Sequence, residues 1–165
     1  MKLSYLAEYA DAARIALDLA DRELSHLRYT HTTLYAEPID LNWVSLLSKR
    51  EDLSEKIDAF MGRFGRLQDH LGEKLLPAFA RLVGGQPKSL LDVLTFSERM
   101  GWIESAEEFV STRKLRNLLV HEYMIQPDIF LETLLSAKAA TELLFRIVAN
   151  IQQEAVACGL VPSVS

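Results

Sequence analysis

Apolar side chains recur along this chain at the three- and four-residue spacing of α-helices, and the strict alternation that marks β-strands is absent. The first such pattern begins at Leu3 and continues through Leu27, which predicts a helix over about residues 3–34. Glu37-Pro38 ends this helix, because proline lacks a backbone N–H and disfavours the helical conformation in the residue before it.

A second helical pattern follows and extends to about Val83. Asp40 is placed to cap its first turn with a side-chain oxygen. Glycine weakens a helix, so glycines inside this pattern predict a bend or a close contact with another helix. They are Gly62, Gly65 and Gly72, and a loop is expected after them at Gly84-Gly85-Gln86-Pro87.

Capping signals then divide the chain into further helices. Ser89, with Asp92 three residues on, opens a short helix that extends to about Met100. Ser105 and Glu108 form an S-x-x-E capping box, which opens the next helix. These two signals place the segment that follows Ser105 on a helix of its own.

The last long helix begins at about Pro127, which suits a first helical turn, and ends at about Ala157, before Gly159. Together these patterns predict an all-α, antiparallel up-and-down bundle of four long helices and a short one. We expect residues 1–165 to form a single domain, because this length can bury a core without disulfides or metal.

Composition and charge narrow the class of protein. The chain is 49% hydrophobic and 25% charged, which is typical of soluble globular proteins. Its formal charge of −5 argues against a general polyanion binder but allows a local basic patch. Cys158 is the only cysteine, so no intramolecular disulfide is expected. Acidic residues at Glu8 and Asp11 argue against a signal peptide, and the cytoplasm is the expected compartment.

The segment LRNLLVHEYM, residues 115–124, places four polar side chains in a helix that is otherwise apolar on nearly every face. An unpaired polar group costs roughly 1–3 kcal/mol when buried, and an unpaired charge costs more. Each of the four therefore requires a partner or a function. They are Arg116, Asn117, His121 and Tyr123.

The spacing of these residues divides them into pairs. At about 100° per residue, Arg116 and Tyr123 fall about 20° apart, and Asn117 and His121 about 40° apart. Arg116 and His121 are about 140° apart and about 7.5 Å apart along the axis. The two side chains can meet only if the long arginine side chain bends round the helix, the helix is distorted, or a second copy of the chain faces the first. A two-fold dimer would bring two such sets into one cleft.

Arginine beside histidine suits phosphodiester chemistry, because guanidinium can bind phosphate through two hydrogen bonds and imidazole can transfer a proton near neutral pH. Asn117 can orient either group, and Tyr123 can donate a hydrogen bond or stack on a base. The competing interpretation is that all four are satisfied structural residues, which is the commoner role of a lone polar side chain in a bundle. The full R-N-x-x-x-H-x-Y pattern favours a function, because it is a rare chance match.

The same residues resemble a known family. Arg116, His121 and Tyr123 match the R-x4-H-x-Y motif of the HEPN superfamily, in particular of HepT-like toxins, and Asn117 is the polar residue expected after the arginine. Two longer segments also resemble the pattern of that family, and together with the helical ends they cover most of the chain. They are RFGRLQDHLGEKLLPAF (63–79) and LLDVLTFSERMGWIESAEEFVSTRKLRNLLVHEYMIQPD (90–128).

The resemblance implies a homodimeric helical bundle with the motif in a cleft between the two copies. It further implies a metal-independent ribonuclease without a cofactor, paired with a minimal nucleotidyltransferase antitoxin that silences it by AMPylating Tyr123. In that chemistry His121 would assist the attack of a ribose 2′-OH on the adjacent phosphate, and Arg116 would stabilise the developing charge. Other relatives are partners of nucleotidyltransferases with no demonstrated nuclease activity.

Two further groups of residues have both a functional and a structural interpretation. Glu23-Leu-Ser-His26 has the spacing used in di-iron bundles, but a single copy favours a solvated helix face over a metal site. A basic rim that contacts RNA phosphates is the functional interpretation of four cations, although most such charges are simply exposed. They are Arg63, Arg66, Arg113 and Lys114.

A polar cluster in the second helical pattern is interpreted as a solvated or interface-lining surface, with a supporting or partner-binding role as the alternative. It consists of Gln68, Asp69, His70 and Glu73.

Three functions therefore remain open from the sequence. The first is an RNA-cleaving toxin, the second is a non-catalytic module that binds substrate for a nucleotidyltransferase partner, and the third is a helical dimer whose polar residues only fix the pairing geometry.

Overall fold

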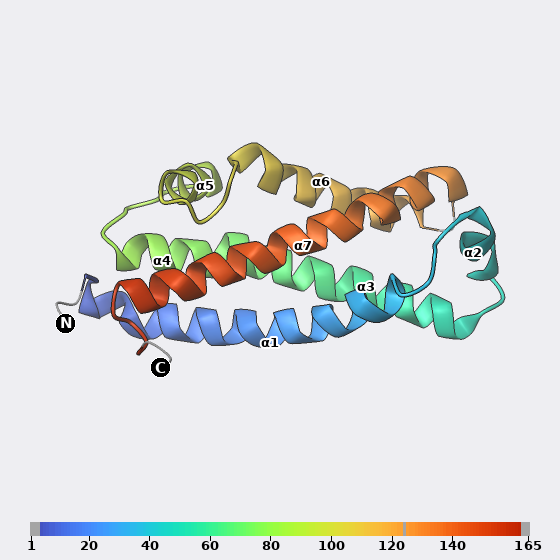
Figure 1. Cartoon of the computed structure of the whole chain (residues 1–165). Helices are drawn as coiled ribbons and strands as arrows, with labels where there is room; N and C mark the ends of the chain where they lie inside the picture. Colours follow the sequence, from blue (N-terminus) through green and yellow to red (C-terminus); the bar gives the residue numbers. More distant parts are fainter. Residues whose placement is uncertain (1–3, 124, 163–165) are drawn as a thin grey trace.

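The long helices run in alternating directions along a common axis, as Figure 1 shows for the computed structural model. The structure describes residues 4–123 and 125–162, and within these residues there is no strand. The predicted all-α bundle is therefore confirmed. Its long helices are α1 (Ala10–Leu34), α3 (Glu51–His70), α6 (Ala106–Glu122) and α7 (Pro127–Ala157).

The first helix begins later than the apolar pattern suggested. A short 3-10 turn, η1 (Ala7–Tyr9), precedes α1, and Leu3, where the predicted helix began, lies outside the described residues. The Leu6 N–H donates to the carbonyl oxygen of Leu82 at 2.8 Å, which attaches this end of the chain to the bundle.

The second helical pattern is interrupted, so the prediction of one helix from Asp40 to about Val83 is wrong. Asp40 does cap a helix, because its Oδ1 accepts from the Trp43 N–H at 2.8 Å, but this helix is only α2 (Leu41–Leu46). Trp43 and Val44 are buried at the end of the bundle, where α2 packs on α7. The chain must then change direction, and Arg50 takes an extended conformation before α3 begins. The expected count of four long helices and a short one is therefore not reproduced.

Glycines mark close packing in this region, as predicted. After α3 the chain continues through a π-helical segment, η2 (Leu71–Leu75), into α4 (Leu76–Leu82). A Cβ on Gly72 would lie 3.3 Å from the ring of Phe109 on α6. Pro77 has no N–H to donate to the preceding turn, which is consistent with the irregular hydrogen bonding there.

The predicted caps of the later helices are confirmed. The side chain of Ser89 accepts from the Asp92 N–H at 3.1 Å and opens α5 (Leu90–Arg99). The side chain of Ser105 accepts from the Glu108 N–H at 3.2 Å and opens α6. Gly159 follows α7 with a φ of 87°, a conformation that favours glycine.

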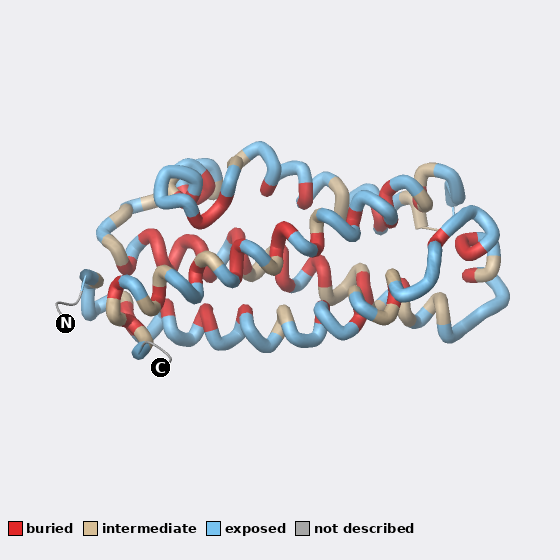
Figure 2. Tube along the Cα trace, in the orientation of Figure 1, coloured by how far each residue is buried: buried red, intermediate tan, exposed pale blue. Residues whose placement is uncertain are grey.

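The buried hydrophobic residues form one core cluster, and Figure 2 marks the buried positions along the helices. α6 lies at the edge of the bundle, and much of its trace in Figure 2 is exposed. Within the described part of the chain, no helix has the length and apolar character needed to span a bilayer. The largest fully buried side chains include Phe60, Phe64, Phe79, Phe109 and Phe130.

A partly buried histidine links α1 to α7. The His31 ring lies 5.2 Å from that of Tyr35 and 5.7 Å from that of Phe145 between ring centroids, and its Nε2 has no hydrogen-bond partner. Burial lowers the pKa of His31 below its ordinary value of 6.5, and this outweighs the raising effects of the Lys138 backbone and Glu142. The folded protein therefore binds a proton at His31 less readily than the unfolded chain does.

This difference predicts a loss of stability in mild acid. The contribution of neutral His31 is fully present above pH 6.5 and is lost as the pH falls from 6.5 through the lower pKa of the folded state. Denaturant unfolding should show the free energy of unfolding decrease across this window. His31→Phe should flatten the pH dependence. An unaltered slope in His31→Phe would contradict this explanation.

Candidate functional site

Arg116 lies across α3 instead of pointing into solvent. Its Nη1 is 3.2 Å from Oδ2 and 3.3 Å from Oδ1 of Asp69, and the side chains are 38% and 34% exposed respectively. A Cβ on Gly65 would lie only 2.8 Å from Nε of Arg116. The guanidinium therefore occupies space that exists because Gly65 has no side chain.

Asn117 and His121 lie on the exposed side of α6, about 100° and 140° round the helix from Arg116. Both are exposed, and on an ideal helix they share a face with Val110, which is also exposed. Leu118 and Val120 flank this face and are 40% and 56% exposed. We call these five residues the α6 outer face. It combines a histidine and an amide with apolar side chains that nothing in the described structure covers.

Tyr123 caps the C-terminal end of α6 and faces α3 and α7. The helix ends at Glu122, and Met124 lies outside the described residues. The Tyr123 hydroxyl lies 2.9 Å from the Ser54 hydroxyl on α3, and its ring lies 5.4 Å from that of Phe130 on α7. The Tyr123 φ of −57° is still helical and its N–H donates to the Leu119 carbonyl at 3.2 Å, so the chain leaves the helix only after Tyr123, and Arg116 and Tyr123 both contact α3.

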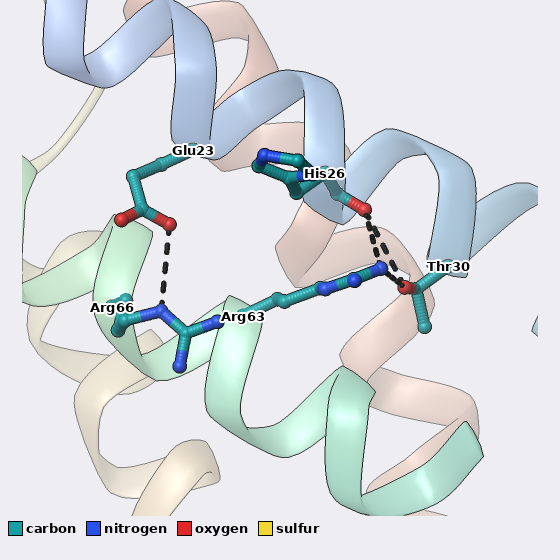
Figure 3. A network of polar contacts seen from close by, with 5 residues as sticks. All are labelled: Glu23, His26, Thr30, Arg63 and Arg66. Atoms are coloured by element: carbon teal, nitrogen blue, oxygen red, sulfur yellow. Dashed lines mark hydrogen bonds and ion pairs between the residues drawn. The ribbon is translucent and has the colours of Figure 1, made fainter. Parts of the chain in front are cut away.

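The four cations of the predicted rim lie on two different sides of the molecule. Arg63 faces α1, where its Nη1 donates to the Thr30 hydroxyl at 2.6 Å and to the His26 carbonyl at 3.2 Å (Figure 3). Arg66 also faces α1, with Nε 3.5 Å from a Glu23 carboxylate oxygen. Arg113 and Lys114 are exposed on α6. α6 thus carries only two of the four predicted rim residues beside the motif.

Glu23 and His26 do not approach a common point. Glu23 pairs with Arg66, and only the backbone carbonyl of His26 is engaged (Figure 3). Across residues 4–123 and 125–162, no three His, Cys, Asp or Glu side chains are grouped to hold a metal ion.

The polar cluster on α3 and η2 is more than a solvated surface. Gln68 is buried at 1% exposure, and its Nε2 donates to the Thr112 hydroxyl at 2.7 Å. His70 Nε2 lies 2.7 Å from the Ala16 carbonyl oxygen. Asp69 is the partner of Arg116, which favours the supporting role that the sequence left open for this cluster, although the pairing itself was not predicted. Gly65 and Asp69 are one helical turn apart, and this spacing was the available signal.

Within one copy the motif supplies two separate chemical groups. Arg116 is held on the α3 side of α6, and the exposed His121 has no hydrogen bond or ion pair with it in the described structure. One copy therefore presents a positioned guanidinium and, on another face, an accessible imidazole. A site that uses both on one phosphate requires a second surface.

The space at Gly65 yields a direct prediction. Gly65→Ala should displace the Arg116 guanidinium and weaken any phosphate binding or cleavage that depends on it, by about tenfold or more. Stability should change little, because the helical preference of alanine, about 0.5–1 kcal/mol, offsets the strain of the contact.

Gly62→Ala is the matched control for this prediction. A Cβ there would meet only Nη1 of Arg66, at 3.3 Å, which is the flexible end of a side chain. This variant should therefore gain stability and keep full function. If Gly65→Ala behaves in the same way as Gly62→Ala, the position of Arg116 does not matter for function.

Comparison with known proteins provides no family for the chain. Models of protein families, curated proteins and solved structures were all compared, and none of them matches. The proposals below therefore rest on the residues of this chain and on the motif they form.

Proposed function

We propose that this protein is a metal-independent ribonuclease of the HepT-like kind, the toxin of a toxin–antitoxin pair. In this proposal it acts as a homodimer in which Arg116 of one copy and His121 of the other meet at one phosphate. The observation that supports it best is the division of the motif. Arg116 is fixed against α3, while His121 lies on an apolar outer face that a second copy can cover.

The proposed reaction is an internal transfer at phosphorus. The ribose 2′-oxygen attacks the adjacent phosphate, the bond from phosphorus to the 5′-oxygen breaks, and the products are a 2′,3′-cyclic phosphate and a 5′-hydroxyl. His121 of one site accepts the proton of the 2′-OH, and the leaving 5′-oxygen receives a proton from the second His121 or from water. Arg116 neutralises the charge that develops on the phosphate oxygens, and Asn117 orients the imidazole.

Tyr123 is proposed as the switch. Its hydroxyl is half-buried at the Ser54 hydroxyl and lies two residues beyond His121. An AMP group attached there by a nucleotidyltransferase antitoxin would replace this contact and add a phosphate and a base on the α3 side of α6, where Arg116 also lies. RNA would then be excluded by both bulk and charge.

A second function is favoured by one specific observation. Arg116 already pairs with a carboxylate of its own chain, and the protein carries a formal charge of −5. Both features suit a non-catalytic subunit that binds substrate for a nucleotidyltransferase partner. Such a subunit would form the same complex but would never cleave RNA.

Induction in cells that lack the antitoxin tests the proposed function. The wild type should stop growth and degrade RNA, and purified protein should cleave RNA in the presence of a chelator. His121→Ala should lower cleavage by roughly 10²–10⁴-fold, because this is the usual contribution of a general acid or base. His26→Ala, at an exposed histidine on α1, is the matched control and should remain toxic.

Co-expression with the antitoxin extends this test to Tyr123. Protection should fail for Tyr123→Phe, which keeps the ring on Phe130 but has no hydroxyl to modify. Equal cleavage by His121→Ala and wild type would disprove the catalytic role. A tight antitoxin complex without cleavage under any condition would establish the second function instead.

A further inference from the structure

A cavity of about 400 Å³ opens beside the Arg116–Asp69 pair, and the mechanism above does not use it. It lies among the end of α3, η2, α4 and the first turns of α5, and α6 forms another wall. Its volume is within the range of sites that bind small organic ligands. Asp69 lines the cavity and also binds Arg116, so the cavity and the motif share a residue.

One wall carries a buried acceptor without a partner. The Thr112 hydroxyl donates its only proton to the Phe109 carbonyl at 2.6 Å, so it must accept the bond from Gln68. This fixes the amide of Gln68 with Nε2 toward Thr112 and leaves Oε1 buried and without a hydrogen bond. Gln68 lines the cavity but Oε1 has almost no exposed surface, so a ligand that donates a hydrogen bond would satisfy this oxygen after a small shift of the cavity wall.

The cavity also has apolar walls and a charged rim. Phe109, Leu90 and Val93 supply apolar surface suited to a flat ring. Among the described residues, the rim cations form no ion pair; they are Arg81, Lys88 and Arg113. Glu73 is the one lining carboxylate without such a pair, because Asp69 is occupied by Arg116. Three cations against one free carboxylate favour an anionic ligand, in a chain that is acidic overall.

We infer that this cavity binds a nucleotide whose base carries an exocyclic amino group. The base lies against the apolar walls and donates to Gln68 Oε1, and its phosphate lies at the cationic rim. Uracil is disfavoured, because it has no exocyclic amino group. Its one donor edge, N3–H, is flanked by two carbonyl oxygens, and these would lie against the Gln68 Oε1 and the Asp69 and Glu73 carboxylates. The nucleotide can be free or part of an RNA strand, and in a strand the cavity would select a base close to the phosphate at Arg116.

Binding is measured on the full-length His121→Ala protein, so that cleavage plays no part. Calorimetric titration with AMP, CMP, GMP and UMP should give at least about tenfold tighter binding of the amino-bearing nucleotides than of UMP. Gln68→Met keeps the side-chain length but removes the oxygen, so it should abolish the preference and leave UMP binding unchanged. Equal affinities for all four nucleotides, or no binding by any of them, would overturn the inference.

A second pair of variants does not touch the core. Lys88→Gln and Arg113→Gln are surface changes, and each should weaken all four nucleotides several-fold but leave nucleosides without phosphate unaffected. Lys49→Gln, an exposed cation in the turn after α2, is the matched control and should change nothing. If Lys88→Gln and Arg113→Gln bind the nucleotides with the same affinity as Lys49→Gln, no phosphate lies at the rim.

Short oligouridines that contain a single adenosine, cytidine or guanosine show whether the cavity binds a free nucleotide or a nucleotide within an RNA strand. Tighter binding than the mononucleotide assigns the cavity to an RNA strand, and weaker binding assigns it to a free nucleotide. In the first case, cleavage by Gln68→Met with His121 intact should lose its base preference while the rate on oligouridine stays the same. Nucleotide binding without any RNA cleavage would disprove the proposed ribonuclease function but leave nucleotide binding by the cavity standing. RNA cleavage without nucleotide binding would disprove the binding by the cavity but leave the ribonuclease function standing.

Discussion

The position of one guanidinium constrains the rest of this structure. Arg116 needs a carboxylate partner and space over the backbone of a neighbouring helix, and Asp69 and Gly65 on α3 provide both. Because the arginine is drawn toward α3, α6 packs with its motif divided between an inner and an outer side. The same contact places Asp69 at the wall of a cavity whose other walls come from helices that follow.

This division explains how four polar residues can occupy an apolar helix. Arg116 and Tyr123 are half-buried and paired, with Asp69 and Ser54 respectively, so neither leaves an unpaired group inside the bundle. Asn117 and His121 avoid the free-energy cost of burying an unpaired polar group, because both side chains are exposed. What remains unexplained within one copy is the apolar surface around them, for which a second copy provides a physical reason.

Much of the fold could be predicted from the sequence, because it follows from local signals. The capping side chains of Asp40, Ser89 and Ser105 and the proline at the start of α7 all act where the pattern placed them. The break after α2 could not be predicted, because it depends on where Trp43 is buried in three dimensions. For the site, the motif residues and the polar cluster with Asp69 and Gln68 were identified, but the pairing of Asp69 with Arg116 and the burial of Gln68 depend on contacts with α6 in three dimensions.

The central claim is that one site takes Arg116 and His121 from different copies, and subunit complementation tests it most directly. Arg116→Ala and His121→Ala chains, each inactive alone, are co-expressed and their mixed dimers are assayed for RNA cleavage. A shared site leaves one of the two sites intact in every mixed dimer, so a random mixture should recover about a quarter of wild-type activity. If mixed dimers form and cleave no RNA, the two residues act within one chain or not at all.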